Sequence, residues 1–328
     1  MEERLLAETR RTRSRIPQRR IGRTDLEAGV LSLGSWHTYD RMDFPDAVAM
    51  LREAVDSGIN LFDVGVYGLP GGPRSFTDII FSAMVRGAGL RRDEYLLSAK
   101  LWLEGYPERS FRTQLEDALV RAGTDYADLV ILGDIRRDGI DLHQVVHDLA
   151  KLVDAGLIRA WGVNNWSASN IQELIDHAAE AGVPGPAVAQ LKYSVSRRAI
   201  PDGEPFARIF EQGVSLESSD ILEGGVLLGK ESRQVGRDPG GVRERIAASA
   251  AELATISEQL GVSPAQFCVA FTLTHPSNAT TLFGATSINQ LRDNIGAVDL
   301  VEQVGADRVR ELAKPLWADQ GVVDPEGP

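Results

Sequence analysis

Short apolar runs alternate along the chain with segments whose apolar residues recur at helical spacing. Eight runs have the length of buried strands: 30–35, 60–64, 95–100, 127–132, 158–164, 187–193, 213–218 and 280–284. Six helical patterns lie between them: 46–57, 76–87, 111–122, 142–155, 169–181 and 242–260. Strands separated by helices predict βα units and a parallel sheet. Eight units predict an α/β fold closed into a (β/α)8 TIM barrel.

The chain before the first unit predicts a short β-hairpin. Residues 20–22 and 26–30 form two extended stretches that would close the bottom of the barrel. We assign residues 1–19, which are rich in arginine, to a basic N-terminal arm. With no internal repeat or low-complexity linker, residues 20–328 are assigned to one barrel domain.

Bulk composition narrows the possible partners. The chain has 328 residues, and its 47 acidic and 35 basic side chains give a net charge of −12, which argues against nucleic-acid binding. The single cysteine, Cys268, excludes an intramolecular disulfide and fits a reducing compartment. Neither a membrane-spanning apolar stretch nor the apolar core of a secretory signal is present in the sequence. We therefore expect a cytoplasmic protein that acts on a small molecule.

Three residues near strand ends predict acid–base chemistry. Asp63 and Tyr67 follow one apolar run, and Lys100 closes the next. A tyrosine has an unperturbed pKa of about 10, so donation of its proton near neutrality needs help. A nearby ammonium favours the phenolate, and a carboxylate keeps that ammonium charged and in place. We expect the strand ends to converge on one face of the barrel.

The other strand ends carry amides, hydroxyls and glycines. They are Gly34, Ser35, Trp36, His37, Gly133, Asn164, Asn165, Gln190, Ser218, Ser219, Asp220, Gly284, Thr286 and Ser287. They show neither the spacing of metal ligands nor a Ser/His/Asp arrangement. Such a set suits a large polar cofactor.

Several motifs together resemble the aldo-keto reductase superfamily. They are Phe62-Asp63-x-x-x-Tyr67-Gly68, Ser98-Ala99-Lys100, Gly162-Val163-Asn164-Asn165, Gln190-x-x-Tyr193 and Gly284-x-Thr286-Ser287-x-x-Gln290-Leu291-x-Asp293-Asn294. The last is more similar to the branch of potassium-channel β-subunits and their bacterial relatives. The resemblance implies NADP(H) as cofactor and Asp63, Tyr67 and Lys100 as catalytic residues, with the pair of Asp63 and Lys100 lowering the pKa of Tyr67. Relatives in this branch are often multimeric, so a homo-oligomer is possible.

The resemblance also implies which residues hold the cofactor. Asn164, Asn165 and Gln190 match positions that grip the nicotinamide carboxamide, although they could instead satisfy one another. Thr286, Ser287 and Gln290 match the site of the adenosine 2′-phosphate at a helix start, with Asn294 near the adenine. Gly34, Ser35 and Trp36 are expected near the nicotinamide. Ser219, Leu222, Gly224 and Lys230 belong to a segment that resembles the loop over the pyrophosphate.

The chain departs from the family pattern at Gly133, where the family usually has histidine. Glycine cannot donate a hydrogen bond to a carbonyl oxygen, and loss of one such donor typically costs about 10²–10³ in rate. The freed volume could admit a bulky substrate or a water molecule. His37, next to Trp36, is a candidate replacement donor, with an exposed loop histidine as the alternative. We expect Asp134 to point along the loop.

A second departure lies after the seventh strand. Ser219 stands where an aromatic ring commonly stacks on nicotinamide, and Asp220 follows it. A carboxylate beside a pyrophosphate is unfavourable unless it faces away. Of the segments expected to hold the cofactor, this one therefore fits the family pattern least well.

These observations predict an NADPH-dependent reductase of a ketone or aldehyde, with Trp36, His37 and Gly133 near the substrate. An enlarged site and abundant Ala, Arg and Gly suggest a sizeable natural-product intermediate as substrate. One alternative is reduction of a conjugated C=C bond or an imine, or elimination, at the site without histidine. Another is a nicotinamide-binding redox sensor or partner protein with little turnover.

Overall fold

The computed structural model describes residues 16–68, 73–136, 138–230 and 241–323. Eight parallel strands form a closed barrel in the order β10-β11-β12-β3-β4-β7-β8-β9. Their bounds are β3 (Leu31–Gly34), β4 (Leu61–Val64), β7 (Leu96–Leu101), β8 (Ala127–Leu132), β9 (Ile158–Asn164), β10 (Val188–Lys192), β11 (Ser215–Ser219) and β12 (Asn278–Phe283). The predicted (β/α)8 barrel is confirmed, with each predicted strand within two residues of its observed ends.

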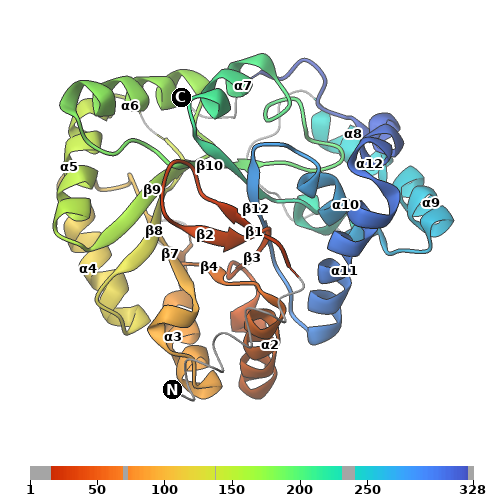
Figure 1. Ribbon diagram of the computed structural model, residues 1–328, viewed down its shortest axis with the longest axis horizontal. Coiled ribbons are helices and arrows are strands. Elements are labelled where there is room, and N and C mark those ends of the chain that lie inside the picture. The colour runs from red at the N-terminus through yellow and green to blue at the C-terminus, as the bar shows by residue number, and fades with distance from the viewer. Residues whose placement is uncertain (1–15, 69–72, 137, 231–240, 324–328) are drawn as a thin grey trace.

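Helices surround the barrel, as Figure 1 shows. The main ones are α2 (Phe44–Ser57), α3 (Thr77–Ala88), α4 (Phe111–Ala122), α5 (Leu142–Asp154), α6 (Ala168–Ala181), α7 (Glu204–Glu211), α8 (Val242–Ala248), α9 (Ala250–Leu260), α10 (Pro264–Leu273), α11 (Ile288–Val304) and α12 (Ala306–Leu312). Short 3-10 turns are η1 (Tyr39–Arg41), η2 (Arg92–Glu94), η3 (Glu223–Leu228) and η4 (Lys314–Leu316). In the described part of the chain, no helix has the length and apolar content that a membrane span requires.

One helical prediction needs correction, and helices such as α10 were not predicted. The single helix predicted over 242–260 is broken at Ser249, whose hydroxyl binds the Ser196 hydroxyl at 2.7 Å and the Ile246 carbonyl at 2.7 Å. Helix α10 escaped prediction because seven of its ten residues are buried, so its sequence has no polar stripe. Buried helices of this kind lack the amphipathic period on which the prediction depends.

An antiparallel hairpin closes one end of the barrel. Its strands are β1 (Gln18–Arg20) and β2 (Glu27–Gly29), and they cross the end of the barrel nearest the viewer in Figure 1. Ile21, Leu26 and Ala28 pack there against inward-facing strand residues. This confirms the predicted hairpin. Residues 1–15 of the predicted arm lie outside the described residues, whereas Ile16 is buried and residues 18 and 19 already belong to β1.

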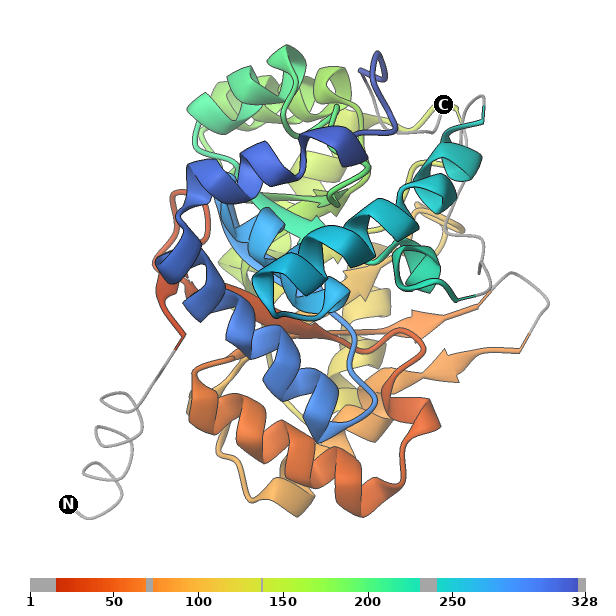
Figure 2. The same cartoon turned by 90° about the vertical axis from the view of Figure 1, so that its right-hand side faces the viewer.

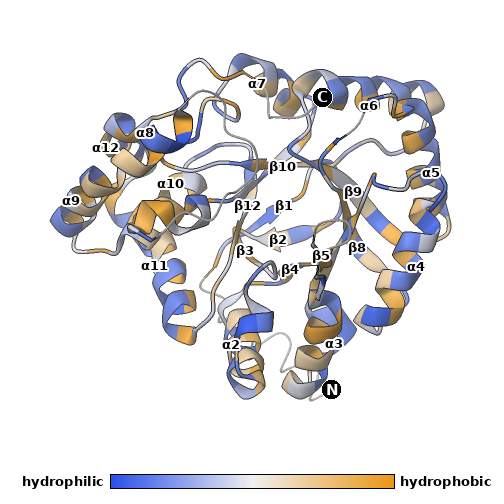
Figure 3. Cartoon of the chain, turned by 180° about the vertical axis from the view of Figure 1, so that it is seen from behind, coloured by the Kyte–Doolittle hydropathy of each residue, from blue (hydrophilic) through white to orange (hydrophobic). Residues whose placement is uncertain are grey.

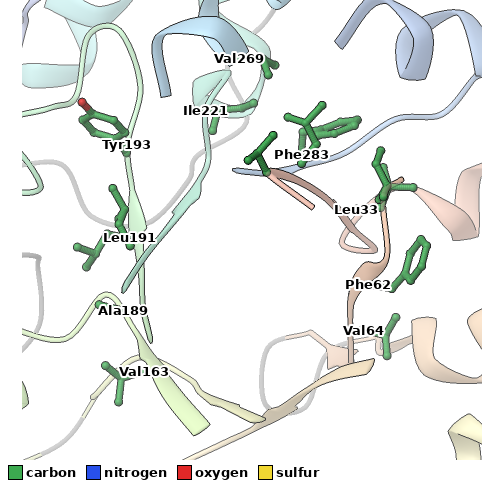
Figure 4. Close-up of a cluster of buried hydrophobic side chains, with 14 of the residues drawn as sticks. Leu33, Phe62, Val64, Val163, Ala189, Leu191, Tyr193, Ile221, Val269 and Phe283 are labelled. Atoms are coloured by element: carbon green, nitrogen blue, oxygen red, sulfur yellow. The ribbon is translucent and has the colours of Figure 1, made fainter. Parts of the chain in front are cut away.

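The main core lies between the strands and the helices. Side chains such as Leu33, Phe62 and Leu191 point outward from the barrel strands in Figure 4, into a continuous apolar layer. The hydropathy colouring of Figure 3 shows both polar and apolar residues on outer helices such as α2, α3 and α4. The apolar residues of such helices supply the other half of that layer. A second hairpin, β5 (Val66–Tyr67) with β6 (Ser75–Phe76), projects at the end of the barrel opposite β1–β2 (Figure 2).

Candidate active site

The carboxyl ends of the barrel strands surround a cavity of about 500 Å³, which is within the usual range for small-molecule sites. This is the barrel end where active sites of this architecture lie. All the predicted site residues except Gly133 and Ser287 line the cavity: Gly34, Ser35, Trp36, His37, Asp63, Tyr67, Lys100, Asn164, Asn165, Gln190, Ser219, Leu222, Gly224, Lys230, Gly284, Thr286, Gln290 and Asn294.

Asp63 links the two other predicted catalytic residues. It lies on β4, only 2% exposed, and its Oδ1 accepts a hydrogen bond from Tyr67 Oη at 2.9 Å. Its Oδ2 accepts one from Lys100 Nζ at 3.2 Å, and the lysine side chain is 6% exposed. Buried charges are tolerated when they are paired and hydrogen-bonded, as these are. The carboxylate thus holds the phenol and the ammonium on its two oxygens.

This arrangement changes the expected acidity of Tyr67. Burial, followed by the charge of Asp63 and the hydrogen bond to it, raises the pKa of Tyr67 well above its ordinary value. The prediction that the pair of Asp63 and Lys100 lowers this pKa is therefore wrong for this arrangement. The first reason is burial of the phenol, and the second is that its hydrogen-bond partner is the Asp63 carboxylate, which lies between it and Lys100. Tyr67 is accordingly a protonated donor at neutral pH.

Trp102 occupies the space that a side chain at Gly133 would need. A Cβ atom built on Gly133 would lie 2.5 Å from Trp102 Cε3 and 2.8 Å from Cζ3. The same indole meets the Tyr67 ring edge-on, with ring centroids 6.2 Å apart, and lines the cavity. The expected free volume at Gly133 is therefore filled. The sequence signal was available, since Trp102 comes two residues after Lys100.

Asp134 turns into the cavity, so the expectation that it points along the loop is wrong. Its Oδ1 accepts hydrogen bonds from the side-chain amides of Asn164 and, at 3.4 Å, Asn165. Asn165 has a left-handed backbone, φ +54°, and its Oδ1 accepts a hydrogen bond from the Lys192 amide at 3.2 Å. The two asparagines are thus held by Asp134 and by the backbone of β10 at the cavity wall.

Gln190 connects the catalytic set to a carboxyl that the sequence analysis missed. Its Oε1 accepts from Lys100 Nζ at 2.6 Å, and its Nε2 donates to Asp63 Oδ2 at 3.0 Å and to Glu217 Oε2 at 3.1 Å. Glu217 is fully buried on β11. Its signal was its place two residues before Ser219, because alternate residues of a strand share one face.

The start of α11 forms one end of the cavity. Ser287 caps the helix by accepting from the Gln290 amide at 3.3 Å, and the Thr286 amide donates to Gln290 Oε1 at 2.9 Å. Asn294, one turn on, is buried, and its Oδ1 has no hydrogen-bond partner within the described chain. Amides at a helix N-terminus favour an anion. Five of the described lysines and arginines line the cavity: Arg41, Lys100, Arg136, Lys192 and Lys230.

The segment after β11 brings an acid to the cavity. Asp220 lines the cavity and has a left-handed backbone with φ +51°. Burial raises its pKa to about 6, with Lys192 opposing the shift. Asp220 thus lines the same cavity as the residues that are predicted to hold the cofactor. Gly224 and Gly225 follow with φ of +67° and +99°, conformations that glycine adopts without strain.

His37 and Trp36 cover the cavity beside Tyr67. Their ring centroids are 4.8 Å apart, and the Trp36 ring is stacked 6.1 Å from that of Tyr67. Together with Trp102, they surround the phenol with aromatic side chains. His37 has φ +56° and lines the cavity. Its role as a hydrogen-bond donor in place of a side chain at Gly133 stays a prediction.

Comparison with known proteins places most of the chain in one family. The model of the Aldo/keto reductase family matches residues 30–313. A putative voltage-gated potassium channel subunit beta of Schizosaccharomyces pombe is 25% identical, covering 92% of this chain and 93% of that protein. Probable voltage-gated potassium channel subunits beta of Oryza sativa subsp. japonica and Arabidopsis thaliana are 28% and 26% identical, each covering 86% of this chain and 90% of its own length.

Proposed function

Because the chain belongs to the aldo/keto reductase family, we propose that it reduces a ketone or aldehyde with NADPH, and that Tyr67 is the general acid. One observation carries the proposal: Tyr67, Asp63 and Lys100 are hydrogen-bonded in series at the cavity wall. A protein that only binds a nicotinamide has no need for a phenol kept protonated in this way. When bound, the cofactor supplies the hydride.

The residues present fit such a cofactor. Asn294 Oδ1 is a buried acceptor without a partner in the described chain, and the α11 N-terminus with Thr286 and Gln290 favours an anionic group. Gly284 lies where a Cβ would come within 2.8 Å of Thr38, so this part of the wall tolerates no larger residue without movement. These residues would hold the adenosine phosphate end, and Asn164, Asn165 and Gln190 the nicotinamide end.

Tyr67 would give its proton to the oxygen of the substrate as the alcohol forms. Asp63 must then release the hydrogen bond of the phenol, and Lys100, paired with Asp63 at 3.2 Å, would offset part of the negative charge left at Tyr67. General acid catalysis of this kind typically contributes about 10²–10⁴ in rate. No side chain at Gly133 assists, so polarisation of the carbonyl rests on Tyr67. The argument for a bulky natural-product substrate loses its first support, because Trp102 fills the space at Gly133.

The test is single-turnover oxidation of bound NADPH by a panel of ketones and aldehydes. We compare the native protein with Tyr67→Phe and with the matched control Tyr39→Phe, a buried phenol outside the cavity lining. Tyr67→Phe should lower the rate about 10²–10⁴-fold, and Tyr39→Phe should stay close to native. Equal rates for native protein and Tyr67→Phe on every substrate would refute the role of Tyr67.

The names of the relatives favour a second candidate, a nicotinamide-binding partner protein of a channel or another assembly. It predicts quenching of protein fluorescence by NADPH without turnover on any substrate of the panel. Conjugated enones and imines belong in the same panel, because Gly133 has no side chain that could donate a hydrogen bond to a carbonyl oxygen. We include in the proposal a cytoplasmic location and a homo-oligomer. Light scattering of the purified protein tests the homo-oligomer, and cell fractionation tests the location.

A further inference from the structure

Glu217 is a buried carboxyl inside the barrel, one layer below the cavity. It lies on β11, and Ser219, two residues later, lines the cavity, so strand alternation turns Glu217 to the same inward side. Its Oε2 accepts from Gln190 Nε2 at 3.1 Å. Its Oε1 has no hydrogen-bond partner in the described chain. An ionised carboxylate in such a place is costly.

Gln190 transmits the state of Glu217 to the catalytic set. Its amide nitrogen donates to Asp63 and to Glu217, while its oxygen accepts from Lys100. Both amide hydrogens are thus shared between two carboxyl groups. A change of charge at Glu217 therefore acts on the hydrogen bonds that hold Asp63 and Lys100.

The charged groups that face Glu217 are unbalanced. Asp63 faces it from β4 and Lys100 from β7, whereas Gln190 on β10 and Thr280, its register partner on β12, are neutral. Two carboxyl groups thus share one ammonium. Burial, followed by the charge of Asp63, raises the pKa of Glu217 to about 7, against the influence of Lys100.

We propose that Glu217 is a positioning residue that, by holding or releasing a proton, sets how firmly Tyr67 keeps the proton that it gives to the substrate. The inference rests on the proposed function of Tyr67. Ionisation passes the Glu217 proton to solvent and leaves a second negative charge beside Asp63. The hydrogen-bonded path from Glu217 through Gln190 and Asp63 to Tyr67 has links of 3.1, 3.0 and 2.9 Å, so the two groups lie on the order of 10 Å apart or less. At an effective dielectric constant of about 20, a unit charge at that distance changes proton affinity on the order of ten-fold. Reduction should therefore slow as the pH rises through neutrality.

The test follows turnover and Tyr67 separately across pH 5.5 to 9. NADPH oxidation is measured for native protein, Glu217→Gln and Asp220→Asn, the last because Asp220 also titrates near the cavity. The chain has six tyrosines, and ¹³Cζ labelling with Tyr67→Phe assigns the Tyr67 resonance. We expect a shift of that resonance with a midpoint near 7 in native protein and Asp220→Asn, and none in Glu217→Gln.

The same comparison predicts turnover. The ratio of the Glu217→Gln rate to the native rate should rise from near one at pH 5.5 to roughly ten at pH 9. The inference is overturned if the rate of Glu217→Gln still changes with pH around 7 as the native rate does. It is also overturned if that change is lost in Asp220→Asn alone. If neither the native protein nor a variant oxidises NADPH, the proposed function fails. The Tyr67 resonance then still tests whether Glu217 is coupled to Tyr67. A resonance that does not sense Glu217 refutes the coupling.

Discussion

The contact between Gly133 and Trp102 makes a quantitative prediction about the barrel mouth. Gly133→Ala adds one methyl group, which would lie 2.5 Å from Trp102 Cε3, whereas carbon atoms pack at about 3.5–4.0 Å. The indole must therefore move by roughly 1 Å. The backbone of Trp102 is held by Gln114. The Oε1 of Gln114 accepts a hydrogen bond from the Trp102 amide at 2.9 Å, and its Nε2 donates one to the Trp102 carbonyl at 3.0 Å.

Overpacking of this kind costs about 1–3 kcal/mol of unfolding free energy. The lower chain entropy of alanine in the unfolded state offsets about 0.4–1 kcal/mol of it. We expect Gly133→Ala to destabilise the protein by about 1–2 kcal/mol. In a Trp102→Ala background, where the clashing ring is gone, the same change should be neutral or slightly stabilising.

A double-mutant cycle measures this coupling by urea unfolding, followed by far-UV circular dichroism because the tryptophan content changes. Gly185→Ala is the matched control, since its added Cβ would meet only the Ala178 Cβ at 3.3 Å. It should change stability by no more than about 1 kcal/mol, and by the same amount in either background. If Gly133→Ala costs the same with and without Trp102, Trp102 does not fill the site of the missing side chain. For the same reason, Gly133→His should not add a useful donor unless Trp102 is truncated.

Two further predictions concern buried acids. The folded pKa of Glu217, about 7, lies above its ordinary 4.5, so its contribution to stability is full below pH 4.5 and is lost as pH rises through 7. Between pH 5 and pH 8, the unfolding free energy of native protein should fall by about 2 kcal/mol relative to Glu217→Gln, as urea unfolding measures; parallel curves would contradict this. Asp220, with its pKa raised to about 6, gains charge between pH 5 and pH 7 at the cofactor end. NADPH affinity, followed by fluorescence quenching, should weaken over that range in native protein and stay flatter in Asp220→Asn; a native-like pH dependence in the variant would show that another group is responsible.

Much of the fold was predictable because its signals are local. Strand β8 is a continuous apolar run with all six residues buried, as a parallel strand covered on both faces must be. Glycine caps such as Gly58, with φ +101°, end helices where the sequence indicates. The failures have a physical reason too. Helix α10 has no polar stripe, and at the break Ser249 is hydrogen-bonded to Ser196, more than fifty residues away, a contact that no local pattern announces.

For the candidate site, the sequence by itself determined which strand ends carry chemistry, and therefore Asp63, Tyr67 and Lys100. Only the tertiary structure decided what those residues face. The indole of Trp102 at Gly133, the turn of Asp134 toward Asn164 and the buried Glu217 beneath Gln190 join different strands and loops. Strand alternation tells which side of a strand a residue faces, but not which atoms the opposite strands bring to meet it. In a closed barrel those neighbours set the pKa of the phenol, because burial and the nearest charge outweigh the residue's own chemistry.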